Sequence, residues 1–231
     1  MAAWALTALA QEAAPLPSGD EVIDRHVQAL GGKQAIEAIA TRAAMGTVQS
    51  PTFGSSGRYG EFFKAPDRLL RAYHVEHYGV VQQCFDGKAG WMETPEYGLE
   101  ELTGPRLQEM RRDAGFENPL RWRARYSRFV AKGRTKVEDR DAIEVLATSA
   151  DGPNETWFFA ADTGLLICRE SPETARDGSS RLVRTYYEDY RETSGIQAAH
   201  TLRHVSPDLI RIVRRAVANN APVDDSRFKR P

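Results

Sequence analysis

The sequence is poor in cysteine and has no long hydrophobic segment. Its 231 residues include only two cysteines, Cys84 and Cys168. This number excludes a framework of several disulfides, and the sequence leaves open whether these two residues pair. No apolar run approaches the roughly 18 residues that a membrane-spanning helix needs. We therefore expect a mature chain without a transmembrane segment.

The chain also lacks a charge excess of either sign. Its formal net charge is −1, from 31 basic and 32 acidic residues. Nucleic-acid-binding proteins derive much of their affinity from neutralising phosphates, so no nucleic-acid partner is expected. The hydrophobic share of 41% and the charged share of 27% are typical of a globular protein.

Catalytic and metal-binding motifs are missing as well. There is no G-x-S-x-G, no H-E-x-x-H and no phosphate-binding glycine loop. His74 and His77 are separated by an odd number of positions on a predicted strand, so their rings point to opposite faces. The acidic pairs fall at predicted turns, where solvated carboxylates are normal. We predict no catalytic residue, no metal and no cofactor, and therefore a protein that is not an enzyme.

The first residues, "MAAWALTALAQEAAPLPSGDE", resemble part of a secretory signal. Residues 2–10 are nearly all apolar, and Ala8-Leu9-Ala10 before Gln11 fits a small-residue cleavage site. The positively charged start of such a signal is missing, and an alanine-rich frayed terminus is the alternative. We predict that residues 1–19 are a signal remnant or a disordered terminus, that the protein is exported to the bacterial periplasm, and that residues 20–231 form one domain.

The clearest helical region spans residues 18–40. Its apolar residues recur at helical spacing, namely at Val22, Ile23, Val27 and Leu30. Ser18 or Asp20 can cap the start, and Gly31-Gly32 ends the first helix as a left-handed C-cap requires. Residues 33–40 predict a second short helix. His26, one turn before Leu30, is interpreted as a structural histidine.

From Thr41 the apolar period changes from 3.6 to 2, which predicts successive antiparallel strands. The stretch "CFDGKAGWMETP" places a cysteine, an acid, a lysine and a tryptophan close together, as an active site would. Asp86-Gly87, however, is a strong hairpin signal, because a type I′ turn needs positive φ at both central residues. Cys84 has no neighbouring histidine to activate it. We interpret this stretch as a turn.

A helical insertion interrupts the strands at about residues 103–127. Leu107 and Met110 share one face of it, and Asn118 can cap a second helix that begins at Pro119. Arginines interleave with its aromatic residues, at Arg111, Arg112, Arg121, Arg123, Arg125 and Arg128. We interpret them as a solvated face with stems lying over apolar neighbours. Contact with nucleic acid, an anionic membrane or the headgroup of a bound lipid is the alternative.

This layout predicts a mainly antiparallel α+β fold. About ten strands in succession cannot form a flat sheet, because strands twist. A strongly curved, unclosed β-barrel with a helical lid over its open face satisfies both the strands and the helices.

Several segments, in this order, resemble bacterial outer-membrane lipoprotein-sorting proteins, which belong to the Lol-type lipoprotein carrier superfamily. They are "DEVIDRHVQALGGKQAIEAI", "KAPDRLL", "FDGKAGW", "RTKVEDRDAIEVLAT", "ETWFFAADTGLL" and "TYYEDYRETSGIQAAHTLRH". The resemblance covers about residues 20–231. It implies an unclosed barrel with a helical lid over an apolar cavity, a periplasmic location and transient holding of acyl chains.

We therefore expect a periplasmic carrier for lipid or lipoprotein acyl chains, which would bind them by burying methylenes at about 0.8 kcal/mol each. A structural or accessory subunit that uses the same groove to bind a segment of an envelope protein is the alternative. The predicted cavity wall consists of Phe63, Leu70, Tyr73, Val81, Trp91, Phe158, Leu166 and Tyr187. The predicted lid residues are Leu107, Met110, Phe116, Trp122 and Tyr126.

Overall fold

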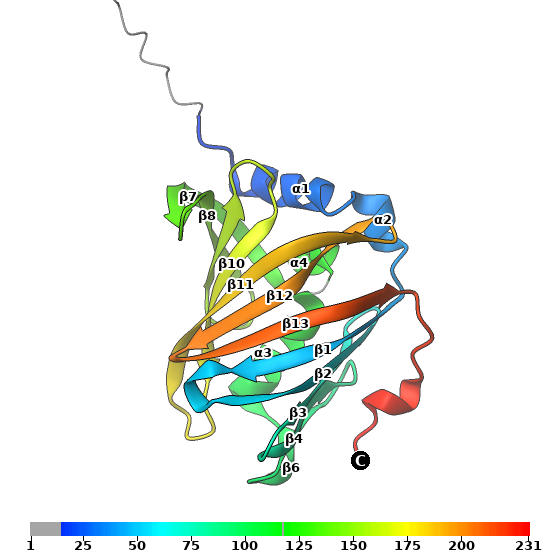
Figure 1. The fold of residues 1–231 in the computed structure, drawn as a ribbon. Helices are drawn as coiled ribbons and strands as arrows, with labels where there is room; N and C mark the ends of the chain where they lie inside the picture. Colours follow the sequence, from blue (N-terminus) through cyan, green and yellow to red (C-terminus); the bar gives the residue numbers. More distant parts are fainter. Residues whose placement is uncertain (1–14, 117) are drawn as a thin grey trace, which may run out of the picture.

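Figure 1 shows the computed structural model, which describes residues 15–116 and 118–231. The predicted signal segment thus lies largely outside the described residues. None of the helices in the described ranges is long and apolar enough to cross a membrane. The helices are α1 (Gly19–Ala29), α2 (Lys33–Glu37), η1 (Pro51–Phe53), α3 (Gly104–Phe116), η2 (Pro119–Arg121), α4 (Trp122–Arg125) and η3 (Asp225–Phe228).

Thirteen strands form one antiparallel sheet whose order is β6-β5-β4-β3-β2-β1-β13-β12-β11-β10-β9-β8-β7. The strands are β1 (Thr41–Ser50), β2 (Ser55–Lys64), β3 (Arg68–Val75), β4 (Gly79–Phe85), β5 (Gly90–Thr94), β6 (Gly98–Leu102), β7 (Tyr126–Val137), β8 (Arg140–Ser149), β9 (Glu155–Ala160), β10 (Leu166–Thr174), β11 (Ser180–Thr193), β12 (Ile196–Ser206) and β13 (Asp208–Asn219). The edge strands β6 and β7 do not pair, so the barrel is unclosed. The predicted fold class is confirmed, with more strands than the expected ten or so.

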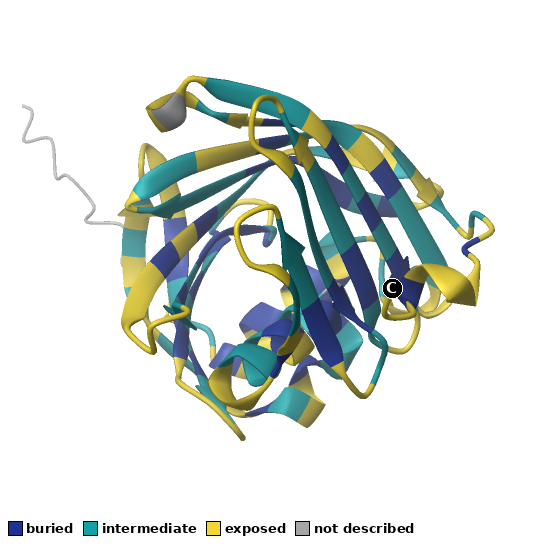
Figure 2. Cartoon of the chain, turned by 90° about the horizontal axis from the view of Figure 1, so that it is seen from below, coloured by how far each residue is buried: buried dark blue, intermediate teal, exposed yellow. Residues whose placement is uncertain are grey.

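Local irregularities bend the sheet into this shape. The register shifts between Met45 and Gly46 in β1, and twice in β7. Such bulges increase the twist and bend the strand. A Cβ atom on Gly46 would lie 1.8 Å from the carbonyl oxygen of Val213, so only glycine allows β1 and β13 to approach here. Figure 2 shows the resulting curl, with helices on the concave side.

The N-terminal helix begins and ends as the sequence predicts. The Glu21 amide donates to Ser18 Oγ over 3.2 Å, and the Ser18 amide donates to the Glu21 carboxylate over 2.7 Å. This reciprocal capping box satisfies two amides that the helix itself cannot. Gly31 and Gly32 follow with φ of 122° and 86°. The second helix, α2, is shorter than expected, since it ends at Glu37.

The Asp86-Gly87 turn is confirmed, but not as a type I′ turn. Strand β4 ends at Phe85 and β5 begins at Gly90, so the loop has four residues. Only Gly87 of the pair has a positive φ, of 102°. The Asp86 carboxylate accepts hydrogen bonds from the amides of Lys88 and Ala89, at 2.7 and 2.8 Å. The expected two-residue turn is therefore a four-residue loop, which the Asp86 side chain stabilises through these two hydrogen bonds.

The two cysteines are buried and free. Cys84 lies on β4 and Cys168 on β10, in opposite halves of the sheet. Burial raises the pKa of each thiol to about 12. Both are therefore protonated, small apolar residues of the sheet rather than nucleophiles.

His26 is a buried structural histidine, as its position on α1 indicates. Its ring stacks on Trp122 with centroids 5.3 Å apart. Its Nδ1 accepts a hydrogen bond from the Leu166 amide at 3.2 Å. Burial lowers the pKa of His26 to about 4, so the ring is neutral at pH 7.

A fall in stability below pH 6.5 should follow from this burial. The unfolded chain takes up a proton near pH 6.5 that folded His26 accepts only near pH 4. The folded pKa is depressed, so the stability is present above pH 6.5 and is lost as the pH falls towards 4. We expect a loss of about 1–3 kcal/mol between pH 7.5 and 4.5, measured by urea unfolding.

Substituting single histidines shows which of them cause this loss of stability. Burial lowers the pKa of His204 to about 4 as well. His26→Phe should therefore make the loss of stability between pH 7.5 and 4.5 smaller, whatever it does to stability at pH 7.5. His74→Phe, at an exposed position, should leave the pH dependence unchanged. An identical slope in His26→Phe and wild type would contradict the assignment.

Candidate ligand-binding cleft

An aromatic cluster fills one half of the concave interior. Trp157 of β9 is at its centre, fully buried, with its ring centroid 4.6 Å from that of Trp122 and 4.8 Å from that of Tyr126. Phe116 of α3 and Phe129 of β7 close the cluster at 5.3 and 5.6 Å. The predicted lid residues Trp122 and Tyr126 are thus packed as core side chains in this structure.

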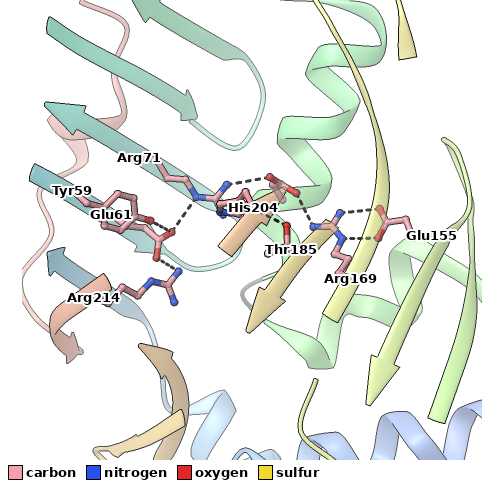
Figure 3. A network of polar contacts seen from close by, with 9 residues as sticks. Tyr59, Glu61, Arg71, Glu155, Arg169, Thr185, His204 and Arg214 are labelled. Atoms are coloured by element: carbon pink, nitrogen blue, oxygen red, sulfur yellow. Dashed lines mark hydrogen bonds and ion pairs between the residues drawn. The ribbon is translucent and has the colours of Figure 1, made fainter. Parts of the chain in front are cut away.

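A largely buried chain of charges crosses the middle of the concave face (Figure 3), and its central member, Asp113, is 31% exposed. Asp113 of α3 accepts a hydrogen bond from Arg71 of β3 at 3.1 Å and from Arg169 of β10 at 2.9 Å. Burial alone would favour its neutral form, but Arg169 and Arg71 hold the pKa of Asp113 at about 2. One carboxylate on the helix therefore links the two halves of the sheet.

Both ends of this chain are equally well paired. At one end, Arg169 binds the Glu155 carboxylate through two nitrogens, at 2.7 and 2.8 Å, and Trp157 Nε1 donates to the same group at 2.8 Å. At the other end, Glu61 accepts from Tyr59 at 2.7 Å and from Arg214 at 2.8 Å. Each acid is thus surrounded by donors, as buried charges require.

Sequence reasoning missed this network. One feature of the sequence could have indicated the network, namely charged residues at inward positions of strands, such as Glu61 between Tyr59 and Phe63. Side chains two apart on a strand share a face, so a charge between two large apolar neighbours indicates burial. The partners come from other strands, and no local spacing identifies them.

The solvated-face interpretation of the arginines is wrong for two of them. Arg112 is only 4% exposed, and its Nε lies 3.5 Å from the Glu155 carboxylate. Arg125 donates to Asp67 at 3.1 Å, and its guanidinium covers Gly115 so closely that a Cβ there would lie 2.1 Å away. The reason is that α3 and α4 lie inside the curved sheet, so the sides of these helices that carry Arg112 and Arg125 meet protein, while Arg111 and Arg123 remain exposed.

A cleft of about 380 Å³ opens between the two halves of the sheet, beside α3. Strands β4 to β6 form one wall, and β10 with the loop to β11 forms the other. Its apolar lining includes Met92, Leu102, Met110 and Pro172. Its charged lining consists of Glu100, Arg106, Glu109, Arg112, Asp113, Arg169, Glu173, Arg176 and Arg181. The cleft is therefore amphipathic. The resemblance had implied a purely apolar cavity.

Ten of the thirteen predicted site residues lie inside the curve of the sheet. Phe63, Phe116, Trp122, Leu166 and Tyr187 line a smaller cavity of about 80 Å³ under the N-terminal helices. Met110 lines the large cleft, and Leu107 packs in the same apolar cluster. Tyr73 and Val81 face each other across β3 and β4, and Tyr126 belongs to the aromatic cluster.

The remaining three, Leu70, Trp91 and Phe158, lie on the convex face, which corrects their assignment to a cavity wall. Leu70 and Trp91 pack against Val223 and Phe228 of the C-terminal segment. Phe158 packs with a separate cluster on the outside of β8 to β10. Both faces of these strands carry apolar residues, so alternation alone could not say which face is concave.

Glu173 in the cleft has an unusual environment. Burial and the nearby Asp113 carboxylate raise its pKa to about 7. Arg181, 4.0 Å away, only partly offsets this effect.

Among residues 15–116 and 118–231, no cluster of His, Cys, Asp and Glu side chains is arranged to hold a metal ion.

Comparison with known proteins identifies the fold. No protein-family model matches the sequence, and no curated protein does. Among solved structures, a DUF1329 family protein from Desulfovibrio piger matches with a TM-score of 0.63 and 10% identity, over 93% of this chain and 98% of that one. A LolA superfamily protein from Nitrosomonas europaea matches with a TM-score of 0.58 and 11% identity, over 93% and 99% of the two chains.

A domain assigned to the outer membrane lipoprotein-sorting proteins of Vibrio parahaemolyticus matches with a TM-score of 0.57 and 11% identity, over 91% of this chain and 97% of that one. The chain therefore has the Lol-type fold, an unclosed antiparallel barrel with helices inside its curve. The resemblance seen in the sequence is confirmed at the level of the fold.

Proposed function

We propose that the protein is a periplasmic, non-enzymatic carrier that binds a lipid or a lipoprotein acyl chain in the cleft of about 380 Å³. The observation that carries this proposal is the cleft itself, in which an apolar floor, formed by Met92, Leu102 and Met110, lies beside charged side chains. An acyl chain on this floor would gain about 0.8 kcal/mol for each methylene taken out of water. The apolar N-terminal segment, typical of an export signal, supports the location.

Helix α3 is the element whose movement would release such a ligand. It supplies Arg106, Glu109, Met110 and Asp113 to the cleft. Asp113 ties the helix to β3 and to β10 at once. Opening the cleft would therefore require these two ion pairs to separate, and it would uncover the apolar floor in the same step.

Organic extraction of the purified protein, followed by mass spectrometry, tests the proposal. A co-purifying acyl species would support the carrier function. Native mass spectrometry after gentle purification distinguishes the alternative, because a stoichiometric protein partner in place of lipid would indicate an accessory subunit of an envelope complex.

Met92→Asp should weaken binding of a fluorescent fatty acid about tenfold. Met92 lies half-buried on the cleft floor, and an aspartate there removes contact with about two methylenes and adds a repelling charge. Leu182→Asp is the matched control, since Leu182 of β11 is 56% exposed and is not one of the residues that line the cleft. Equal binding by Met92→Asp and wild type in a fluorescence titration would exclude this floor as the acyl site.

A further inference from the structure

Two arginines from opposite sides of the cleft meet on one carboxylate at its rim. Glu100 of β6 contacts Arg176 through one oxygen, and its other oxygen lies 3.8 Å from Arg106 at the start of α3. The Glu100 side chain is 24% exposed, so its carboxylate sits at the boundary between cleft and water. The protein's own carboxylate thus already occupies a site built from two guanidinium groups.

The loop that carries Arg176 spans the mouth of the cleft. It joins β10 to β11, and the Arg176 guanidinium lies 3.9 Å from the ring centroid of Tyr97, in the turn between β5 and β6. At the base of the loop, the Thr174 amide and hydroxyl both donate to Glu109, at 2.8 and 2.7 Å. Arg176 is therefore held over the cleft by contacts other than its pair with Glu100.

The rim site adjoins the apolar floor. Arg106 reaches down to Met92, with its Nη2 3.6 Å from the Met92 sulfur. Met92 lines the cleft together with Leu102 and Met110. A molecule with a charged end at the two arginines would therefore extend its apolar part along this floor.

The other carboxylates of the cleft are Glu173, which lies 4.0 Å from Arg181 and not at the two rim arginines, and Asp113 and Glu109. Asp113 is bound between Arg71 and Arg169, and Glu109 holds Thr174. Among the described residues that line the cleft, only Glu100 is placed to balance both Arg106 and Arg176. Arginine pairs well with carboxylate and phosphate because its planar donors match their oxygens. Displacing Glu100 into water would thus leave two guanidinium groups for an incoming anion.

We propose that the ligand of the cleft is an anionic amphiphile, whose carboxylate or phosphate takes the place of Glu100 between Arg106 and Arg176. This inference rests on the proposed carrier function and adds the headgroup to it. A neutral headgroup cannot replace the charge of Glu100, so it leaves the pairs intact and gains only the apolar contacts. The site therefore selects by charge, while the floor supplies affinity.

The test compares a fluorescent fatty acid with its methyl ester, which has the same chain and no charge, on the full-length protein. We expect the acid to bind at least about tenfold more tightly than the ester. Arg176→Gln should weaken acid binding about tenfold and leave ester binding unchanged. Glu100→Gln should strengthen acid binding, because it removes the competing carboxylate.

Glu101→Gln is the matched control. Glu101 is the next residue of the same strand, is exposed, and pairs with Arg230 at 3.4 Å on the outside. It should bind acid and ester like the wild type. Circular dichroism melting of each variant verifies that the fold is retained, and Arg106→Gln provides a second removal of positive charge if Arg176→Gln does not fold.

The outcomes separate the two proposals. Equal binding of acid and ester, unchanged in the arginine variants, would overturn the anionic headgroup and leave the carrier function standing. No binding of either probe would overturn the carrier function itself. Displacement of the acid by lysophosphatidic acid at lower concentration than by unlabelled fatty acid would support phosphate as the natural headgroup, and the reverse order would support carboxylate.

Discussion

Trp157→Ala should lower the free energy of unfolding by about 3–5 kcal/mol, the usual cost of removing a large buried aromatic side chain. Trp157 is fully buried, and four aromatic rings surround it with centroids within 5.6 Å. The alanine would leave a cavity between α4 and the strands, and the structure could close it only by moving several rings. Urea denaturation followed by far-ultraviolet circular dichroism measures the change without relying on tryptophan fluorescence.

A matched control shows that the loss comes from packing. Leu182→Ala, at a position 56% exposed on the convex side, should change stability by no more than about 0.5 kcal/mol. A loss below about 1.5 kcal/mol in Trp157→Ala would mean that the cluster is loosely packed. The aromatic half of the interior would then be available to a ligand, as the predicted lid residues had suggested.

Glu155→Gln should cost about 3–5 kcal/mol, because it breaks a buried ion pair while leaving the positive partners in place. The Glu155 side chain has no exposed surface, and it accepts two hydrogen bonds from Arg169 and lies 3.5 Å from Arg112. Glutamine keeps the shape but offers one acceptor in place of a carboxylate. Arg169 would retain only Asp113 as a charged partner.

An exposed ion pair supplies the comparison. Glu138 binds Arg203 at 2.7 Å, but its side chain is 58% exposed. Glu138→Gln should therefore change stability by less than about 1 kcal/mol, since water screens such pairs. Equal losses in Glu155→Gln and Glu138→Gln, measured by urea denaturation, would show that the interior network is hydrated and open.

The network of buried charges holds α3 in place between the two halves of the sheet. A buried ion pair is weak evidence for stability, because desolvation offsets much of the attraction, and apolar residues often stabilise as well. In this protein the ion pairs position the helix. Asp113 accepts hydrogen bonds from Arg71 of β3 and Arg169 of β10, and these bonds hold α3 between the two strands. The width of the cleft therefore depends on these charged contacts.

The sequence alone determined the local structure of this protein. Ser18 and Glu21 specify the start of α1, Gly31-Gly32 specify its end, and Asp86-Gly87 specifies a chain reversal. Alternating apolar residues from Thr41 onwards specify strands, and the return of helical spacing near residue 104 specifies α3. Each of these signals acts over a few residues, so it needs no knowledge of distant partners.

Only the tertiary structure decided which face of each strand lies inside and which charges meet there. Leu69 and Leu70 are equally apolar, yet Leu69 packs with Met110 of α3 and Leu70 packs with Phe228 of the C-terminal segment. Arg71 and Arg169 are 98 positions apart and share one carboxylate. The physical reason is that the curvature of the sheet, set by pairing across the whole chain, determines which side becomes concave.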